Sequence, residues 1–349
     1  MRLTPIAVIG LTAALLAAAI PFAARAQSPS ASNDASDQAR ILVQANAALQ
    51  AGEADKALAL LASLPESGPA SAQTHNLICR VRMTLEQFDA AANECEHAVQ
   101  LDGQNSNDHL WLGRALGEKA DRASFLTAFS LAKRTRAEFE EAVRLNPHNT
   151  EALVSLGEFY REAPGVVGGG VDKAIEIAAQ LDQTDPERAH EFRAHLAEQK
   201  KDYLAAESGF KQAIAIGPHP AIGWNALACF YFRRQRYPEM ESAMHSLLTA
   251  AQRDRRAGVA LYDAAGQLIE ASRNADLAAA MLDEYLSNSA KVEEAPAFIA
   301  HLRLARLKDQ LGDHVAAARE RAAALALASQ YKPAQEFKSQ DPAAQQATN

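Results

Sequence analysis

The sequence is poor in aromatic residues, in basic charge and in long apolar runs. Aromatic residues make up 6% of its 349 residues, within a hydrophobic total of 48%. Because alanine supplies much of that total, the balance disfavours a β-rich core and favours closely packed helices with small contact residues. The 43 acidic residues also outnumber the 35 basic ones. An acidic chain is a poor general ligand for nucleic acid, so we expect no nucleic-acid partner.

The longest apolar run lies at the N-terminus, over residues 6–20. It follows Arg2 and precedes the sequence Ala-Arg-Ala at 24–26. A positive start, a short apolar run and a small-x-small cleavage site are typical of a secretory signal peptide. We therefore expect residues 1–26 to be a signal peptide, the mature chain to start at Gln27, and the protein to be periplasmic or secreted.

The same run is short for a membrane-spanning helix, which needs about 20 apolar residues. An uncleaved membrane anchor is the alternative interpretation of this segment. A lipoprotein anchor is disfavoured, because the segment contains no cysteine. No later segment is apolar enough to cross a bilayer, so we expect no membrane span after signal cleavage.

A pattern of small and large residues returns along the chain. Its clearest copies are Phe88-x2-Ala91, Ala98, Leu101 and Asn105; then Tyr203-x2-Ala206, Ala213, Ile216 and Pro218; and, for the other half of the unit, Trp224-x2-Leu227-Ala228-x2-Tyr231. Small residues let helix axes approach to about 8–10 Å, and a proline stops the second helix of a pair. A two-helix unit of about 34 residues is the tetratricopeptide signature. Over residues 39–331 the chain thus resembles the tetratricopeptide repeat family.

The resemblance implies an all-α fold, a tetratricopeptide superhelix (an α-solenoid) of about eight antiparallel helix pairs with a concave groove. The motif carries packing residues and not catalytic ones, so the resemblance assigns no reaction. Outside the solenoid at 39–331, we expect residues 27–38 to be a flexible leader and residues 332–349 to be a disordered tail. Both segments are polar and nearly free of large apolar residues, a composition that rarely forms a core.

Two units are longer than the standard repeat. Residues 119–136 indicate a lengthened amphipathic helix, which could cap the superhelix or offer a second contact site. Residues 163–170 are rich in glycine. A phosphate-binding loop would continue with Gly-Lys-Ser/Thr, whereas this chain continues with Val171-Asp172-Lys173. We therefore expect an interhelical loop here, with Asp172 capping the helix that follows.

No group of residues predicts catalysis. His190 and His195 resemble a zinc-protease motif, but they are five residues apart, whereas one helix face needs a separation of four. The repeat position that Trp224 fills holds histidine in four other units, which indicates packing: His75, His109, His190 and His301. Because these four are a repeat or more apart, they could not share a metal ion. We expect no catalytic residue, no metal and no cofactor, and we predict that the protein is not an enzyme, since the repeats leave no room for a catalytic domain.

The three cysteines divide into a pair and a single residue. Cys79 and Cys95 hold repeat positions that face each other across one helix pair, by the resemblance to the family. A disulfide and a pair of buried thiols are both open at this point, and an exported location permits the disulfide. Cys229 is then unpaired, on or near the groove side of its helix.

In the family, certain positions of each first helix tend to line the concave face. These positions and their neighbours give the candidate groove: Asn76, Arg80, Trp111, Arg114, Glu158, Arg161, Phe192, His195, Asn225, Phe232, Arg233 and Gln267. Arg80, Arg114, Arg161 and Arg233 would make parts of the groove basic despite the acidic whole. A protein or peptide partner with acidic or carboxylate features would suit such a surface.

Three classes of function follow from these observations. The leading hypothesis is an exported scaffold that binds a protein or peptide in its groove, where work in cell-envelope assembly or chaperoning would fit. The second is a periplasmic carrier of a small ligand or glycan, which would stack on Trp111, Phe192 and Phe232. The third, an enzyme hidden in the repeats, would need a cluster of titrating groups that the sequence does not offer.

Overall fold

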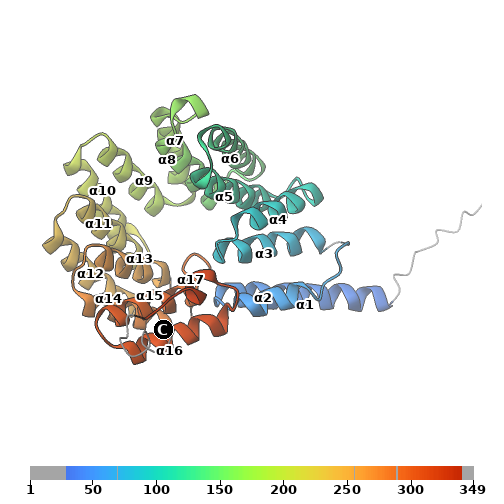
Figure 1. Cartoon of the computed structure of the whole chain (residues 1–349). Helices are drawn as coiled ribbons and strands as arrows, with labels where there is room; N and C mark the ends of the chain where they lie inside the picture. Colours follow the sequence, from blue (N-terminus) through green and yellow to red (C-terminus); the bar gives the residue numbers. More distant parts are fainter. Residues whose placement is uncertain (1–28, 69, 255, 288–289, 340–349) are drawn as a thin grey trace, which may run out of the picture. The chain divides into compact units, whose positions relative to one another are not determined.

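The computed structural model describes residues 29–68, 70–254, 256–287 and 290–339 (Figure 1). The chain divides into a short unit, residues 1–37, and a large one, residues 38–349, and the account below concerns the large unit. The expected signal peptide lies outside the described residues. Within them, no helix is both long and apolar enough to cross a bilayer.

Throughout the described residues the regular structure is helical, and the predicted all-α fold is confirmed. The helices form eight consecutive pairs, as expected from the repeat pattern (Figure 1). The first four pairs are α1 (Pro29–Gln50) with α2 (Ala54–Leu61), α3 (Ser71–Thr84) with α4 (Phe88–Leu101), α5 (Ser106–Arg122) with α6 (Phe125–Leu145), and α7 (Thr150–Glu162) with α8 (Val171–Thr184).

The other four pairs are α9 (Pro186–Gln199) with α10 (Tyr203–Ile216), α11 (Pro220–Arg233) with α12 (Tyr237–Ala251), α13 (Gly258–Glu270) with α14 (Ala275–Ser287), and α15 (Ala297–Gln310) with α16 (His314–Leu327). A short helix, α17 (Lys332–Gln335), follows the last pair. Pro238 stands in the first turn of α12, where proline is tolerated.

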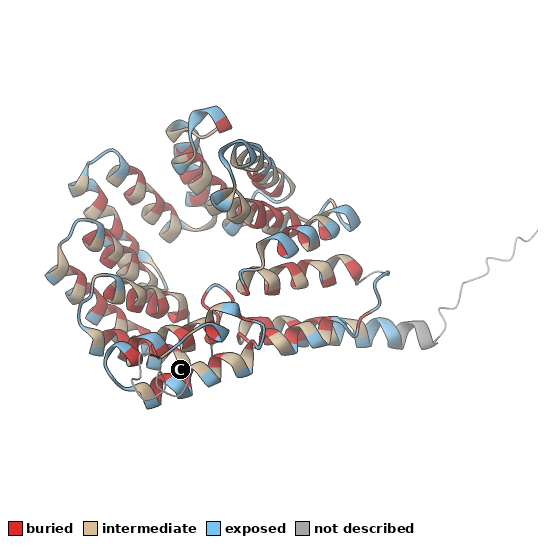
Figure 2. Cartoon of the chain, in the orientation of Figure 1, coloured by how far each residue is buried: buried red, intermediate tan, exposed pale blue. Residues whose placement is uncertain are grey.

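Small residues set the distance between packed helices, as the repeat pattern predicts. Ala91, Ala206 and Ala213 are almost fully buried. A Cβ atom at Gly113 would lie 2.5 Å from Phe139 Cε1, which shows how closely the aromatic ring of α6 approaches α5. The buried side chains follow the helix sides that face neighbouring helices (Figure 2).

The first and last pairs of the large unit share one hydrophobic core. Leu49 and Leu85 belong to the same buried cluster as Phe298 and Tyr331. A Cβ atom at Gly52 would lie 2.5 Å from the backbone nitrogen of Ala297, so only glycine allows this approach. The two ends of the repeat array therefore contact each other, a feature that the repeat pattern did not predict.

Both segments expected to lack structure are partly helical. Within residues 27–38, α1 begins at Pro29. The start of the expected tail, residues 332–349, forms α17, with Ala334 buried. Arg321 donates hydrogen bonds to the backbone carbonyls of Ala334 and Gln335. Composition alone missed these contacts because a few apolar residues suffice to dock a short segment on an existing core. Residues 340–349 lie outside the described part of the chain.

The two insertions lengthen helices and build one loop. Residues 119–136 extend two helices, α5 and α6, beyond the standard unit, and the first two residues of α6, Phe125 and Leu126, are 84% and 80% exposed. Within residues 163–170 a 3-10 helix, η1 (Gly165–Val167), is followed by Gly168 at a φ of 97°. The expectation for Asp172 is wrong: Gly170 occupies the N-cap of α8, and Asp172 lies in the first turn without a capping hydrogen bond. The helix starts two residues earlier than the sequence indicated.

Candidate functional site

Two adjoining hollows lie along the first helices of the pairs. The first hollow has a volume of about 580 Å³ and is lined by residues of α3, α5 and α7. The second hollow has a volume of about 680 Å³ and is lined by residues of α7, α9, α11 and α13. Glu151 and Glu294 line both hollows, so the two lie side by side. First helices thus supply the groove, as the resemblance to the family implied.

Most of the predicted groove residues lie in or beside these hollows. The first hollow is lined by Asn76, Arg80, Trp111 and Arg114, and the second by His195, Asn225 and Arg233. Arg161 lines a smaller hollow together with His195 and Arg233. Glu158 forms an ion pair with Arg161. Gln267 contacts Cys229, which lines the second hollow.

The two phenylalanines of the prediction do not line the groove. Phe192 is 3% exposed and lies in the core between α7 and α9, where a Cβ atom at Gly157 would be 2.8 Å from its ring. Phe232 is partly buried and packs against the largest core cluster. In both cases the free energy gained by burying an aromatic ring favours contact with the core over exposure in the groove.

In the first hollow, a tryptophan lies between two arginines. The guanidinium carbons of Arg80 and Arg114 lie 5.3 Å and 4.8 Å from the centre of the Trp111 ring. Arg80 forms an ion pair with Glu293, and Arg114 forms one with Glu151 at 2.7 Å. Both guanidinium groups are therefore already neutralised.

The same hollow contains a buried aspartate. Asp108 is 2% exposed and accepts a hydrogen bond from Asn76 Nδ2 at 2.7 Å. Its second oxygen, Oδ2, is buried without a hydrogen-bond partner. Burial, together with the nearby charge of Asp102, raises the pKa of Asp108 to about 6.

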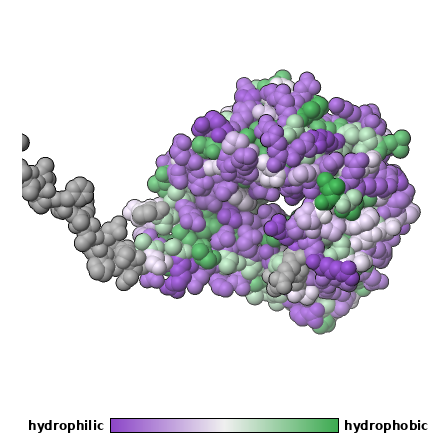
Figure 3. Space-filling view, turned by 180° about the vertical axis from the view of Figure 1, so that it is seen from behind, coloured by the Kyte–Doolittle hydropathy of each residue, from purple (hydrophilic) through white to green (hydrophobic). Residues whose placement is uncertain are grey.

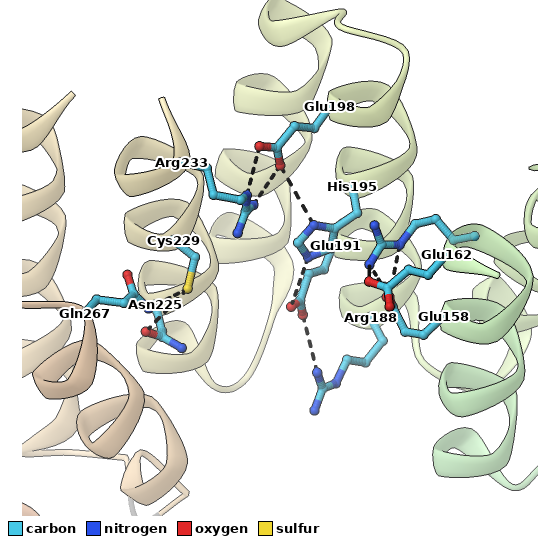
Figure 4. A network of polar contacts seen from close by, with 11 residues as sticks. Glu158, Glu162, Arg188, Glu191, His195, Glu198, Asn225, Cys229, Arg233 and Gln267 are labelled. Carbon is cyan, nitrogen blue, oxygen red and sulfur yellow. Dashed lines mark hydrogen bonds and ion pairs between the residues drawn. The ribbon is translucent and has the colours of Figure 1, made fainter. Parts of the chain in front are cut away.

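In the second hollow, charged groups of α9 and α11 follow one another (Figure 4). Arg188 lies 3.5 Å from Glu191, and Glu198 accepts hydrogen bonds from Arg233 at 2.6 and 2.9 Å. His195 stands between the two carboxylates, 3.9 Å from Glu191 and 4.0 Å from Glu198. Burial, with Arg233 close by, lowers the pKa of His195 to about 4, so its ring is neutral at neutral pH.

Two carboxylates of the second hollow form no ion pair with any residue in the described part of the chain. Glu187 Oε1 is buried without a hydrogen-bond partner. Burial and the neighbouring Asp185 raise the pKa of Glu187. Burial also raises the pKa of Asp263 to about 6, against the opposing effect of Arg303. Both groups would be stabilised in their charged form by a cation that entered the hollow.

The arginines on which the expectation of a basic groove and an acidic partner rested do not stand alone. Each of the four arginines on which the prediction rested is paired with a carboxylate: Arg80 with Glu293, Arg114 with Glu151, Arg161 with Glu158 and Glu162, and Arg233 with Glu198. Among the residues that the structure describes, nine carboxylates and five arginines line the two hollows together: Asp102, Asp108, Glu151, Asp185, Glu187, Glu191, Asp263, Glu293 and Glu294, against Arg80, Arg114, Arg188, Arg233 and Arg256. The surplus of charge in the groove is negative.

Part of this acidic lining could have been found in the sequence. Asp108, Glu151 and Glu187 all lie in the first turn of a first helix, where the helix dipole favours acidic residues. A recurring acid at that place in successive units is the signal that the prediction missed. Glu293 lies in the connection between α14 and α15, and the repeat pattern says nothing about such a segment.

The cysteines are arranged as the repeat positions indicated. Cys79 of α3 and Cys95 of α4 form a disulfide, with their Cα atoms 5.4 Å apart. Cys229 is free and lines the second hollow. Gln267 Nε2 donates a hydrogen bond to Cys229 Sγ, and burial raises the pKa of the thiol to about 11. This thiol is therefore a poor nucleophile at neutral pH.

Comparison with known proteins gives distant similarities. No family model matches the chain. It is 28% identical over 130 residues, 36% of its length, to the Superkiller complex protein 3 of Mus musculus, and it spans 8% of that protein's length.

Among solved structures, the chain resembles TTC0263, a thermophilic TPR protein of Thermus thermophilus, at 17% identity and a TM-score of 0.45, covering 59% of this chain and 97% of that one. A tetratricopeptide repeat protein from Parabacteroides merdae is 13% identical at a TM-score of 0.46, with 77% and 98% covered. MamA is 21% identical at a TM-score of 0.37, with 46% and 87% covered. The identification of the fold rests on the helix pairs and packing residues described above.

Proposed function

We propose that this protein is a binding scaffold that holds a segment of a partner protein rich in lysine or arginine along its two hollows. The observation that carries the proposal is the surplus of carboxylates among the described lining residues, several of which are desolvated and form no ion pair within the described ranges. Asp108, Glu187 and Asp263 all have raised pKa values because burial disfavours their charged forms. A lysine or arginine side chain of a partner would compensate each of these charges.

The lining of the hollows favours a polar polypeptide over a small apolar ligand. Small-molecule sites are mostly lined by hydrophobic and aromatic side chains, whereas carboxylates, arginines and amides dominate here. Of the three stacking residues on which a glycan carrier would depend, Trp111 lines a hollow, whereas Phe192 is buried in the core and the partly buried Phe232 packs against a core cluster. Tetratricopeptide folds are generally scaffolds without catalytic residues, which is consistent with binding as the activity.

Export to the periplasm or beyond the cell is part of the proposal. The Cys79–Cys95 disulfide supports it, because disulfides persist in oxidising compartments and are rare in the cytosol. The N-terminal pattern of positive, apolar and small residues supports it independently. A partner in envelope assembly or chaperoning would follow from such a location. Sequencing the N-terminus of the protein recovered from periplasm tests this point, with Gln27 expected as the first residue.

Binding of short peptides of opposite charge tests the proposal. Fluorescence anisotropy would compare labelled Lys/Ser and Glu/Ser peptides of equal length with the full chain, at low and at physiological ionic strength. The Lys/Ser peptide is expected to bind more tightly, and its affinity to fall as salt rises.

A charge-matched pair of variants then separates the hollows from the general acidity of the chain. Glu187→Gln/Asp263→Asn removes two carboxylates from the second hollow, and Glu270→Gln/Asp283→Asn removes two exposed ones. The first variant is expected to lose affinity for the Lys/Ser peptide and the second to retain it. Equal loss in both variants, or tighter binding of the Glu/Ser peptide, would overturn the proposal.

A further inference from the structure

Three potential metal ligands meet on the α3–α4 pair, away from the groove residues. His75 belongs to α3, and Glu94 and His97 belong to α4. One ligand atom from each residue lies within 4.8 Å of the others. His75 Nδ1 and Glu94 Oε2 are 2.6 Å apart, and the rings of His75 and His97 meet edge to face with centroids 5.2 Å apart. In the part of the chain that the structure describes, this is the one group of three such residues close enough to hold an ion.

The same helix positions in other pairs show which part of this cluster belongs to packing. His109 pairs with Glu138 at 2.6 Å, and His301 pairs with Glu320 at 2.8 Å, in the manner of His75 with Glu94. The histidine–glutamate contact is therefore a recurring link between the two helices of a pair.

The third ligand is specific to α4. The residue three positions after the recurring glutamate is His97 in α4, Glu141 in α6 and Ala323 in α16. Glu141 is engaged by Arg144 on its own helix. His97 is exposed, so the packing of buried side chains does not require histidine there. From the sequence, the repeat position of His75 was assigned to packing. Packing explains the contact between His75 and Glu94, but it does not explain a histidine at position 97.

We propose that His75, Glu94 and His97 form a binding site for Zn²⁺. Two imidazole nitrogens and one carboxylate are a common zinc ligand set, and three protein ligands leave a fourth position for water or another ligand. Glu94 and His97 are three residues apart, so both side chains lie on one face of α4. Zinc ligands at about 2.0–2.2 Å from the ion stand roughly 3.3 Å apart from one another. On binding the ion, the His75–Glu94 pair at 2.6 Å would therefore open, and the exposed His97 would move toward it from within 4.8 Å.

The ion would fix a part of the fold that supports the first hollow. His75 precedes Asn76, which holds the buried Asp108. Glu94 precedes Cys95, whose disulfide already joins α4 to α3. A metal at this place would be a second link across the same helix pair. The inference does not depend on what the groove binds.

Zinc titration of the full chain, purified without a histidine tag, tests the site. Isothermal titration calorimetry is expected to give one zinc ion per chain, and zinc is expected to raise the melting temperature. His97→Ala should weaken binding by at least about tenfold and abolish the shift in melting temperature. Because His97 is exposed, this variant should fold as the wild type does, which circular dichroism checks.

The matched control is His301→Ala, which removes the histidine at the repeat position of His75 from a pair where Ala323 stands in place of His97. It should retain wild-type zinc affinity. Equal loss in both variants, or full affinity in His97→Ala, would overturn the proposal and show scattered or adventitious binding. Co²⁺ provides a second readout: weak visible bands from nitrogen and oxygen ligands are expected and should vanish in His97→Ala. A strong thiolate charge-transfer band would place the metal on Cys229 and contradict the site.

Discussion

Arg80 and Glu293 are 213 residues apart in the sequence and face each other through two hydrogen bonds. Arg80 Nε donates to Glu293 Oε2 at 2.9 Å, and Nη2 donates to Oε1. Both side chains are largely buried, at 16% and 7% exposure. Gln50 Nε2 donates to the same carboxylate at 2.9 Å. Glu293 thus ties the second helix pair of the array to the segment that leads into the last pair.

Removing Arg80 is expected to destabilise the fold. Arg80→Ala leaves the Glu293 carboxylate buried without its cation, which should lower the free energy of unfolding by about 3 kcal/mol. Urea denaturation followed by circular dichroism measures the effect. Lys56→Ala breaks the exposed pair with Glu53 and should change stability by less than about 1 kcal/mol. Similar small effects in both variants would mean that the Arg80–Glu293 contact between the two ends of the repeat array contributes little to stability.

The disulfide is expected to stabilise the α3–α4 pair. It closes a loop with a sequence separation of 16, and loops of this length correspond to about 3 kcal/mol of stability. Cys79→Ser/Cys95→Ser should lose about that amount in urea denaturation. Cys229→Ser is the control and should lose less, since this thiol is unpaired. Mass spectrometry of unreduced protein provides the independent check, and free thiols at both Cys79 and Cys95 would contradict the bond.

Stability should depend on pH through Asp108. Because its pKa in the folded chain is raised from 3.8 to about 6, the folded state binds the proton more tightly than the unfolded state does. The contribution of Asp108 to stability therefore falls as pH rises from about 4 to about 6, and stays low above that. Asp108→Asn removes the free-energy cost of burying a charged carboxylate, and it keeps a side-chain oxygen that can accept the hydrogen bond from Asn76 Nδ2.

The variant should be more stable than the wild type by about 1–3 kcal/mol near pH 7.5, and the difference should shrink near pH 4. Urea denaturation at the two pH values measures it. Loss of stability at the higher pH, or a gain of the same size at both, would show that the carboxylate is not desolvated as described.

Overpacking at Ala206 tests the repeat pattern itself. Ala206 on α10 is fully buried, so Ala206→Phe should cost about 1–3 kcal/mol and lower the melting temperature. Leu204, two residues earlier on the same helix, is 86% exposed. Leu204→Phe should leave the melting temperature nearly unchanged. Equal effects of the two substitutions would mean that the packing face of α10 is assigned wrongly.

The sequence predicted the contacts that form between the two helices of a single repeat unit. Ala206 and the disulfide partners Cys79 and Cys95 follow from positions inside a single helix pair, where spacing determines the neighbours. Glu293 could not be predicted in the same way, because it reaches Arg80 from a connection that belongs to no repeat. Phe192 shows a second limit: a position that often faces the groove lies in the core here, because the adjacent Gly157 leaves room for its ring.

Pairing between units limits the expected basic character of the groove for a related reason. Arg114 and Arg233 were counted as free charges, whereas Glu151 and Glu198 on neighbouring units neutralise them. Pairing between units cannot be inferred from residue counts along one helix. One face of the molecule is shown in Figure 3, where hydrophilic residues dominate and apolar patches are small and separate.

The most direct measurement of the central claim is the position of a bound cationic segment. A Lys/Ser peptide that carries a photoreactive benzophenone would be cross-linked to the full chain, and the adducts located by digestion and mass spectrometry. The account predicts adducts on the helices that line the two hollows, α3, α5, α7, α9, α11 and α13, competed by unlabelled peptide and reduced in Glu187→Gln/Asp263→Asn. Adducts concentrated instead on second helices, or at the exposed turn around Phe125, would contradict it.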